Sequence, residues 1–242
     1  MLQMEVFGYH KNKMVRIMNK SIVILPHFDD EIFQTGAFLL KYKEEIELFI
    51  THPNDTISNS LYNLQKKMFI KTISLINEFR LKNNLKKIKT YIYNYSNFNG
   101  YIKANNRKKI QKDLENVMSK ENIDYFITTV KSTHQSHRIC NEIAISCLRS
   151  PYIEKINNIL LATYPQDEYG ISFTDKKINA YIQLEKHEVE FLCYCIKEIY
   201  GIKNNNKKIL NSDSFYKYLS YFGIKSGNEF AMPFYILKTV LM

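Results

Sequence analysis

Hydrophobic residues recur along the chain in two alternating patterns, short continuous runs and longer amphipathic segments. The first run, Ser21–Pro26, is rich in β-branched residues and is typical of a strand buried on both faces. The segment that follows, Asp30–Glu44, spaces its apolar residues as a helix does. The same reading predicts strands at Ile46–Thr51, Ile88–Tyr95, Tyr125–Val130, Ile156–Thr163 and Pro233–Val240, and helices at Leu61–Phe79, Arg107–Met118, His137–Leu148, Lys176–Tyr200 and Phe215–Phe222.

Strands that alternate with helices in this way predict an α/β fold with a mostly parallel central sheet and helices on both faces, a Rossmann-like three-layer arrangement. No internal repeat interrupts the pattern, and seven glycines and five prolines are too few for a flexible linker. We therefore expect a single domain over residues 1–242, with residues 1–20 as the one candidate appendage.

The charge of the chain bears on its partners. Lysine and arginine outnumber aspartate and glutamate by 34 to 24, which gives a net charge of +10. The lysines are interleaved with asparagines and accompany no nucleic-acid-binding motif, so we do not expect nucleic acid as a partner. A positive field would instead favour an anionic small-molecule substrate.

Cysteine usage and apolar runs bear on the compartment. No apolar run approaches the ~20 residues of a membrane helix, and the N-terminus lacks the apolar segment of a secretory signal, so we predict no transmembrane segment. The four cysteines form no C-x-x-C pair. We expect them to be buried thiols in the reducing cytoplasm.

Two predicted loops hold most of the chain's candidate chemistry. In open α/β sheets, ligands bind at the carboxyl ends of the strands, in the loops that lead into helices. The loop after the first strand, Pro26–Glu31, reads PHFDDE, and the loop after the fourth strand, Thr133–Arg138, reads THQSHR. Both loops are expected at the same edge of the sheet.

These residue types are those of a metal site. Zinc takes imidazole nitrogens and carboxylate oxygens, and a catalytic zinc keeps a fourth position open beside three protein ligands. His27 and Asp30 are three residues apart at a strand-to-helix corner, and His134 and His137 have the same spacing at the start of a helix. A His/Asp/His set would leave Asp29 and His134 over, the types needed for a general base and for a general acid or oxyanion donor.

Simpler roles are open for the same residues. Acidic residues at a helix start also cap free N–H groups, and a single His-x-x-His pair is common on protein surfaces. His52, which follows the second strand, would either touch substrate or stabilise a turn. The residues alone therefore leave both capping and metal binding open.

The two loops also resemble a known family. Pro26–Glu31 resembles the His-Pro-Asp-Asp-Glu stretch of the PIG-L/LmbE-like zinc N-deacetylases, and His134–Arg138 resembles the second motif of that family, His-x-Asp-His-Arg. The resemblance implies a zinc-dependent hydrolase that removes an acetyl or other acyl group from the nitrogen of an N-acetylated sugar, nucleotide sugar or glycoconjugate.

The resemblance also implies a role for each matching residue. His27, Asp30 and His137 would bind Zn²⁺. Asp29 would be the general base, and His134 would protonate the leaving amine or stabilise the oxyanion.

The chain departs from the family pattern at several positions, and Gln34 and Thr35 stand in a stretch that is usually smaller and glycine-rich. Phe28 replaces a proline, Ser136 stands where the second motif has an aspartate, and Met232 occupies an acidic position near the C-terminus. Because the three implied ligands and the base are all kept, we expect an active enzyme with a shifted substrate preference. Two alternatives stay open: a non-catalytic relative that binds a sugar or anion, and a zinc amidase on a thiol-sugar or antibiotic intermediate.

Overall fold

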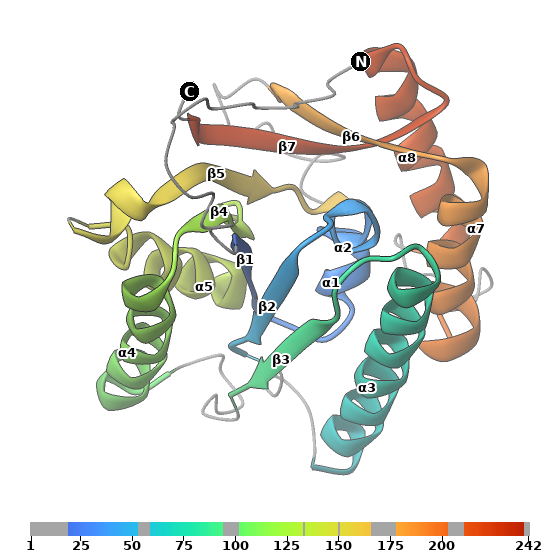
Figure 1. The fold of residues 1–242 in the computed structure, drawn as a ribbon. Coiled ribbons are helices and arrows are strands. Elements are labelled where there is room, and N and C mark those ends of the chain that lie inside the picture. The colour runs from blue at the N-terminus through green and yellow to red at the C-terminus, as the bar shows by residue number, and fades with distance from the viewer. Residues whose placement is uncertain are drawn as a thin grey trace.

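The computed structural model describes residues 19–52, 59–93, 102–132, 134–149, 151–165, 178–202 and 211–239, and a seven-stranded sheet forms its centre (Figure 1). The strands are β1 (Lys20–Leu25), β2 (Glu45–Ile50), β3 (Ile88–Ile92), β4 (Ile123–Thr129), β5 (Ile156–Ala162), β6 (Ala180–Leu184) and β7 (Phe230–Thr239). Their order across the sheet is β3-β2-β1-β4-β5-β7-β6. The first five are parallel, and β7 runs antiparallel to both of its neighbours, β5 and β6. The mostly parallel sheet predicted from the sequence is confirmed.

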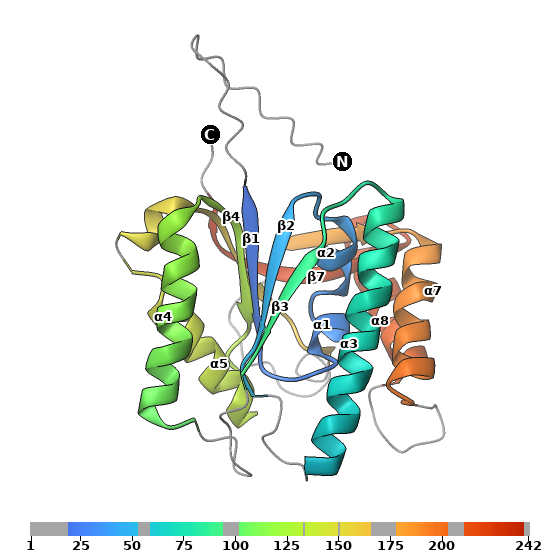
Figure 2. The ribbon, with the colours of Figure 1, turned by 60° about the horizontal axis from the view of Figure 1, so that its bottom comes forward.

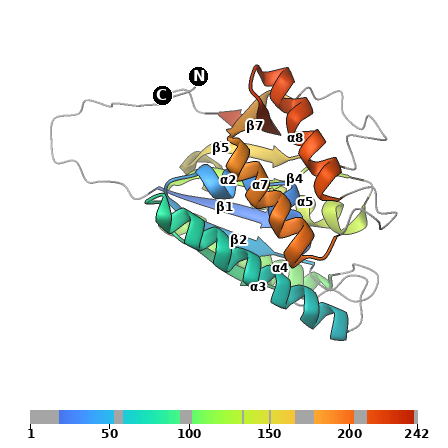
Figure 3. The same cartoon turned by 90° about the vertical axis from the view of Figure 1, so that its right-hand side faces the viewer.

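Helices cover both faces of this sheet. They are α1 (Asp30–Phe33), α2 (Gly36–Lys41), α3 (Asn59–Lys82), α4 (Ala104–Lys120), α5 (Gln135–Ser146), α7 (Lys186–Tyr194) and α8 (Ser212–Ser226), with a 3₁₀ turn η1 (Tyr152–Lys155) and a π-helical turn η2 (Cys195–Ile199). Figure 2 shows α4 and α5 on one side of the sheet and α3 and α7 on the other. Figure 3 shows α3, α7 and α8 over the same face. The predicted three-layer fold is therefore confirmed.

The two faces of β1 illustrate why this strand lies in the middle. Ile22 and Ile24 belong to the apolar cluster under α4 and α5, whereas Val23 and Leu25 belong to the cluster shared with α2, α3, α7 and α8. Successive side chains of a strand point to opposite faces, so a continuous apolar run is what a strand between two helical layers requires.

The predicted helix over Asp30–Glu44 is divided into two short helices. It breaks at Gln34 and Thr35, where the Gln34 side chain turns back to Asp30. Gly36 then opens α2 beside α7. A Cβ atom there would lie 2.9 Å from a methyl carbon of Leu192, so the absence of a side chain allows the two helices to approach closely.

The predicted helix over Lys176–Tyr200 is wrong in its first part. Ala180–Leu184 forms β6, which pairs antiparallel with β7, and α7 begins only at Lys186. The pairing partner lies about fifty positions further along the chain, with Leu184 opposite Phe230. A local hydrophobic pattern carries no information about such a partner.

Some expectations fall partly outside the described residues. The candidate appendage is described only from residue 19 on, and Lys20 already belongs to β1. Thr133 of the second loop is not among the described residues. Among the helices of the described segments, none is both long enough and apolar enough to cross a membrane.

Candidate metal centre

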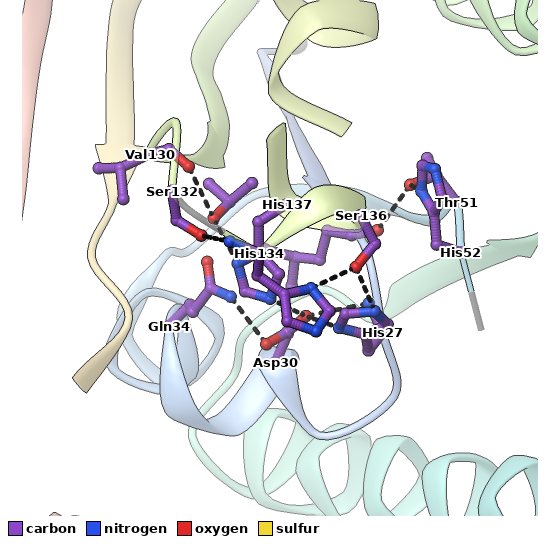
Figure 4. Close-up of polar contacts among 12 residues, drawn as sticks. His27, Asp30, Gln34, Thr51, His52, Val130, Ser132, His134, Ser136 and His137 are labelled. Atoms are coloured by element: carbon purple, nitrogen blue, oxygen red, sulfur yellow. Dashed lines mark hydrogen bonds and ion pairs between the residues drawn. The ribbon is translucent and has the colours of Figure 1, made fainter. Parts of the chain in front are cut away.

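The two candidate loops meet because their strands are neighbours in the sheet. β1 pairs in parallel with β4, with Ile24 opposite Thr128, so both strands end at the same edge. Figure 4 shows the side chains of His27 and Asp30 from the first loop beside those of His134, Ser136 and His137 from the second. More than a hundred positions of chain separate these loops, and the sheet brings them together.

The first loop has a strained backbone. Asp29 lies at the start of α1 with a φ of 84°, in the left-handed region that residues other than glycine rarely adopt. Its side chain makes no capping hydrogen bond. Strain of this kind costs about 1–3 kcal/mol and is concentrated at functional sites. Capping, the simpler role considered for this residue, is therefore not what its side chain does here.

Asp30 is the centre of the polar contacts. Its side chain is buried, with Oδ2 accepting from the His27 backbone N–H at 2.9 Å and Oδ1 accepting from Gln34 Nε2 at 2.7 Å. Burial alone would raise the pKa of Asp30, but the charge of His137 and the hydrogen bonds from His27 outweigh it and hold the pKa below its usual range. The carboxylate is thus charged and fixed in one orientation.

Two imidazole nitrogens face the same carboxylate oxygen. His27 Nδ1 lies 3.4 Å from Asp30 Oδ2, and His137 Nε2 lies 3.7 Å from it. Ligand atoms about 2.1 Å from a tetrahedral zinc are separated by roughly 3.4 Å. The distances of both nitrogens from the carboxylate oxygen, and the chemistry of the three groups, therefore fit a zinc ion.

Thr129 determines which nitrogen of His137 is available. Its hydroxyl donates to Val130 O at 3.3 Å and lies 3.2 Å from His137 Nδ1, so it accepts the Nδ1–H of that ring. When the ring loses its second proton, as binding a metal requires, its lone pair is on Nε2, the nitrogen that faces Asp30. Fixing a ligand histidine through its other nitrogen is the usual second layer of a metal site.

His134 offers a second possible ligand set. One nitrogen from each of His27, His134 and His137 lies within 4.8 Å of the others. His134 is exposed, whereas His137 is buried and His27 is half-buried. Both candidate sets share His27 and His137 and differ in whether Asp30 or His134 is the third ligand.

Ser136 connects the two rings of the opposite loops. Its hydroxyl lies 2.7 Å from His27 Nε2 and 2.6 Å from His134 Nδ1. The nitrogen of His27 that contacts Ser136 is therefore not the one that faces Asp30. Met232, another departure from the family pattern, is buried in the apolar core of β7, where it contributes packing.

His52 is completely buried at the end of β2. Its backbone N–H donates to Pro26 O at 2.7 Å, and its Nδ1 lies 2.7 Å from Thr51 Oγ1. These contacts hold the first loop in place, and the residues of the turn after His52 lie outside the described part of the chain. A direct contact between His52 and substrate stays a prediction.

Several residues of the site had no recognisable pattern in the sequence. Gln34 and Thr129 contact the candidate ligands directly, and Tyr164, after β5, packs its ring 5.0 Å from that of His137. The only available indication was position, since Thr129 and Tyr164 lie at carboxyl ends of parallel strands.

Behind the site, Glu31 is an unusual buried acid. Burial raises its pKa to about 8, and it accepts a hydrogen bond at 2.5 Å from the hydroxyl of Tyr200, the residue that follows η2. The contact ties α1 to the end of α7 and η2. It anchors the helix that begins with Asp30.

Comparison with known proteins finds the same fold in solved structures. No protein-family model matches the chain, and no curated protein matches it. The N,N'-diacetylchitobiose deacetylase of Pyrococcus horikoshii is similar in structure, with a TM-score of 0.61, 17% sequence identity, and coverage of 90% of this chain and 84% of that one.

Two further structures show what else this fold carries. The zinc-inhibited form of teicoplanin deacetylase Orf2 gives a TM-score of 0.60 at 8% identity, covering 90% of this chain and 97% of the other. GalB, the 4-carboxy-2-hydroxymuconate hydratase of Pseudomonas putida KT2440, gives 0.66 at 8% identity, covering 93% and 98%. At these identities the likeness establishes a shared fold, and a fold used by both deacetylases and a hydratase does not by itself fix the reaction.

Proposed function

We propose that this chain is a zinc-dependent hydrolase that removes an acetyl or related acyl group from the nitrogen of an N-acetylated sugar, nucleotide sugar or glycoconjugate. The observation that carries the proposal is the convergence of His27 Nδ1 and His137 Nε2 on the Asp30 carboxylate, at 3.4 and 3.7 Å. The deacetylases among its structural neighbours support the reaction class.

In this proposal His27, Asp30 and His137 are the ligands. Asp30 is favoured over His134 because it is buried and its charged oxygen already faces both ring nitrogens, whereas His134 is exposed. Zinc held there would supply a Lewis acid that lowers the pKa of water from 15.7 towards about 7 and polarises an amide carbonyl.

The remaining polar residues carry the proton transfers. Asp29, half-buried and held by the turn before α1, is the proposed base that takes the proton of the attacking water. His134, exposed at the start of α5, is the proposed donor to the oxyanion or to the leaving amine. The positive charge of the chain favours an anionic member of the substrate class.

The test is metal analysis of the purified protein, followed by acetate release from N-acetylated sugars and their UDP forms. We expect one zinc per chain in the wild type, and loss of both zinc and turnover in His27→Ala and His137→Ala. Asp29→Asn should keep zinc and lose roughly 10²–10⁴-fold in rate. His187→Ala is the matched control, since that ring lies on α7 with a largely exposed side chain.

Two further variants decide the third ligand. Asp30→Asn should weaken zinc binding, whereas His134→Ala should keep stoichiometric zinc and turn over poorly. The opposite pair of results would favour the three-histidine set. Full zinc in both His27→Ala and His137→Ala would overturn the proposal.

The non-catalytic alternative makes a different prediction. A sugar- or anion-binding module without zinc would release no acetate, and its ligand affinity would be unchanged in Asp29→Asn. An amidase on a thiol-sugar or antibiotic intermediate would instead bind zinc and hydrolyse those conjugates in preference to N-acetyl sugars.

A further inference from the structure

The Ser136 hydroxyl occupies a position between two imidazole rings that come from different loops. Ser136 is completely buried, and its Oγ lies 2.7 Å from His27 Nε2 and 2.6 Å from His134 Nδ1. Both distances are those of strong hydrogen bonds. The same hydroxyl therefore serves both rings at once.

The number of donor hydrogens limits how the contacts of Ser136 with the two rings can be arranged. A serine hydroxyl has one hydrogen to donate and lone pairs to accept with, and a neutral imidazole has one N–H and one bare nitrogen. Ser136 can therefore donate to only one of the two rings. If both contacts are hydrogen bonds, the other ring must donate its N–H to Ser136.

The direction of the two hydrogen bonds follows from the role of His27 as a proposed metal ligand. When His27 Nδ1 faces Asp30 as a metal ligand, the hydrogen of the neutral ring is on Nε2 and is donated to Ser136 Oγ. The hydroxyl hydrogen of Ser136 is then donated to His134 Nδ1, which must be bare. The hydrogen of the neutral His134 ring is consequently on Nε2.

We infer that Ser136 is a positioning residue that links the tautomer of the candidate ligand His27 to that of His134, and so presents His134 as a neutral Nε2–H donor. This inference deepens the proposed function and rests on it for the direction of the hydrogen bonds. Such a donor suits an oxyanion.

A carboxylate at position 136 would act differently. It has no hydrogen, so both rings would donate to it, and the hydrogen of a neutral His134 would be on Nδ1. Replacing an aspartate by serine in this position therefore reverses which nitrogen of His134 is the donor. The substitution changes how the site works and keeps both hydrogen bonds.

The test is long-range ¹⁵N–¹H NMR of histidine-labelled protein, which distinguishes Nδ1–H from Nε2–H. In the zinc-loaded wild type we expect Nε2–H for both His27 and His134. Ser136→Ala should leave His27 unchanged, because the metal still fixes it, and should give His134 a mixture of tautomers. Ser136→Asp should move the His134 hydrogen to Nδ1.

Ser132→Ala is the matched control. The Ser132 hydroxyl accepts from the His134 backbone N–H at 3.0 Å, so this variant disturbs the same loop without touching a ring nitrogen. It should leave the His134 tautomer as in the wild type. We also expect Ser136→Ala to lose roughly 10- to 100-fold in activity or zinc affinity, as removal of a ligand's outer partner typically does.

The outcomes separate this inference from the proposed function. If zinc binds but wild-type His134 carries its hydrogen on Nδ1, the inference is overturned and the function stands. If no zinc binds, yet His134 is Nε2–H and changes in Ser136→Ala and not in Ser132→Ala, the function fails and the link through Ser136 stands. No zinc and no response to Ser136→Ala would overturn both.

Discussion

Arg80 is the largest side chain that the core of the described residues buries completely. Its guanidinium donates to three backbone carbonyls, Leu39 O and Lys86 O at 2.5 Å and Glu44 O at 2.9 Å. Burial lowers its pKa to about 10, so it is still charged at neutral pH. One side chain thus holds the end of α2, the turn before β2 and the turn before β3.

Replacing Arg80 by lysine keeps the charge and removes the planar fork that reaches three acceptors. We expect Arg80→Lys to lower the free energy of unfolding by about 2–4 kcal/mol, because hydrogen bonds from a charged group are worth about 1.5–3 kcal/mol each. Urea denaturation measures the loss. Lys82→Ala, on the exposed side of the same helix, should change stability by no more than about 0.5 kcal/mol; equal losses in the two variants would contradict this role.

The cysteines give a prediction about pH. Cys140, Cys147 and Cys195 are buried, Cys193 is half-buried, and burial raises the pKa of each to about 12. Because a raised pKa keeps the thiol neutral, only about one in ten thousand is a thiolate at pH 8. We expect a thiol reagent at pH 8 to label the native protein very slowly, at a rate that rises about tenfold per pH unit, and to label all four cysteines in denaturant. Rapid labelling of the native protein would contradict the packing around these thiols.

At the scale of single residues, the sequence predicted the candidate metal ligands better than the residues that hold those ligands in place. His27, Asp30 and His137 belong to two recognisable loops, and the structure brings them together. Gln34 and Thr129 contact them only because of how the chain folds, and an amide or a hydroxyl next to a strand has no pattern of its own.

At the scale of elements, Gly223 shows why α8 can lie against β7. A Cβ atom at this position would lie 2.3 Å from Glu229 O, and the nearest other atoms are also backbone. Backbone cannot move aside as a flexible side chain can. The turn between α8 and β7 therefore requires glycine within the helix.

We expect Gly223→Ala to destabilise the protein by about 3 kcal/mol, the upper end of the usual cost of overpacking. For a chain of this size that corresponds to a fall in Tm of about 6–12 °C. Gly36→Ala is the control, because the three atoms nearest to its added Cβ all belong to the end of the Leu192 side chain, which can rotate away. A smaller loss in Gly223→Ala than in Gly36→Ala would contradict the argument.

Elements that depend on their own residues were predicted, and those that depend on a distant partner were not. The apolar run of β1 and the long amphipathic pattern of α3 could each be recognised from their own residues. β6 is a strand because β7 pairs with it, and its five residues are too few for an alternating pattern to exclude a helix. The break between α1 and α2 likewise depends on the contact of Gln34 with Asp30.

At the scale of the whole molecule, the two ends of the central strands carry different polar clusters. At the carboxyl ends, the loops of β1 and β4 meet at the candidate metal centre. At the amino ends, Lys20 forms ion pairs with Glu47 at 2.7 Å, Glu121 at 2.9 Å and Glu45 at 3.4 Å. These contacts raise the pKa of Lys20 well above its usual range despite its burial, so it is charged throughout the physiological pH range.

This division predicts that zinc and the Lys20 cluster stabilise the fold independently. A ligand that binds only the folded state, at a concentration about 100 times its Kd, adds about 2.7 kcal/mol to the free energy of unfolding. For a chain of this size that raises the Tm by about 5–10 °C. We expect saturating zinc to raise the Tm of the metal-free wild type by that amount, and to leave the Tm of His137→Ala unchanged.

Lys20→Met should lower the Tm at every zinc concentration, because it leaves the buried Glu47 without its cation, and should keep the full increase on adding zinc. The two sites lie at opposite ends of β1 and have no residue in common among the contacts described above, so their effects should add. An increase retained in His137→Ala would place the zinc elsewhere in the molecule, and an increase lost in Lys20→Met would mean that the metal centre depends on the far edge of the sheet.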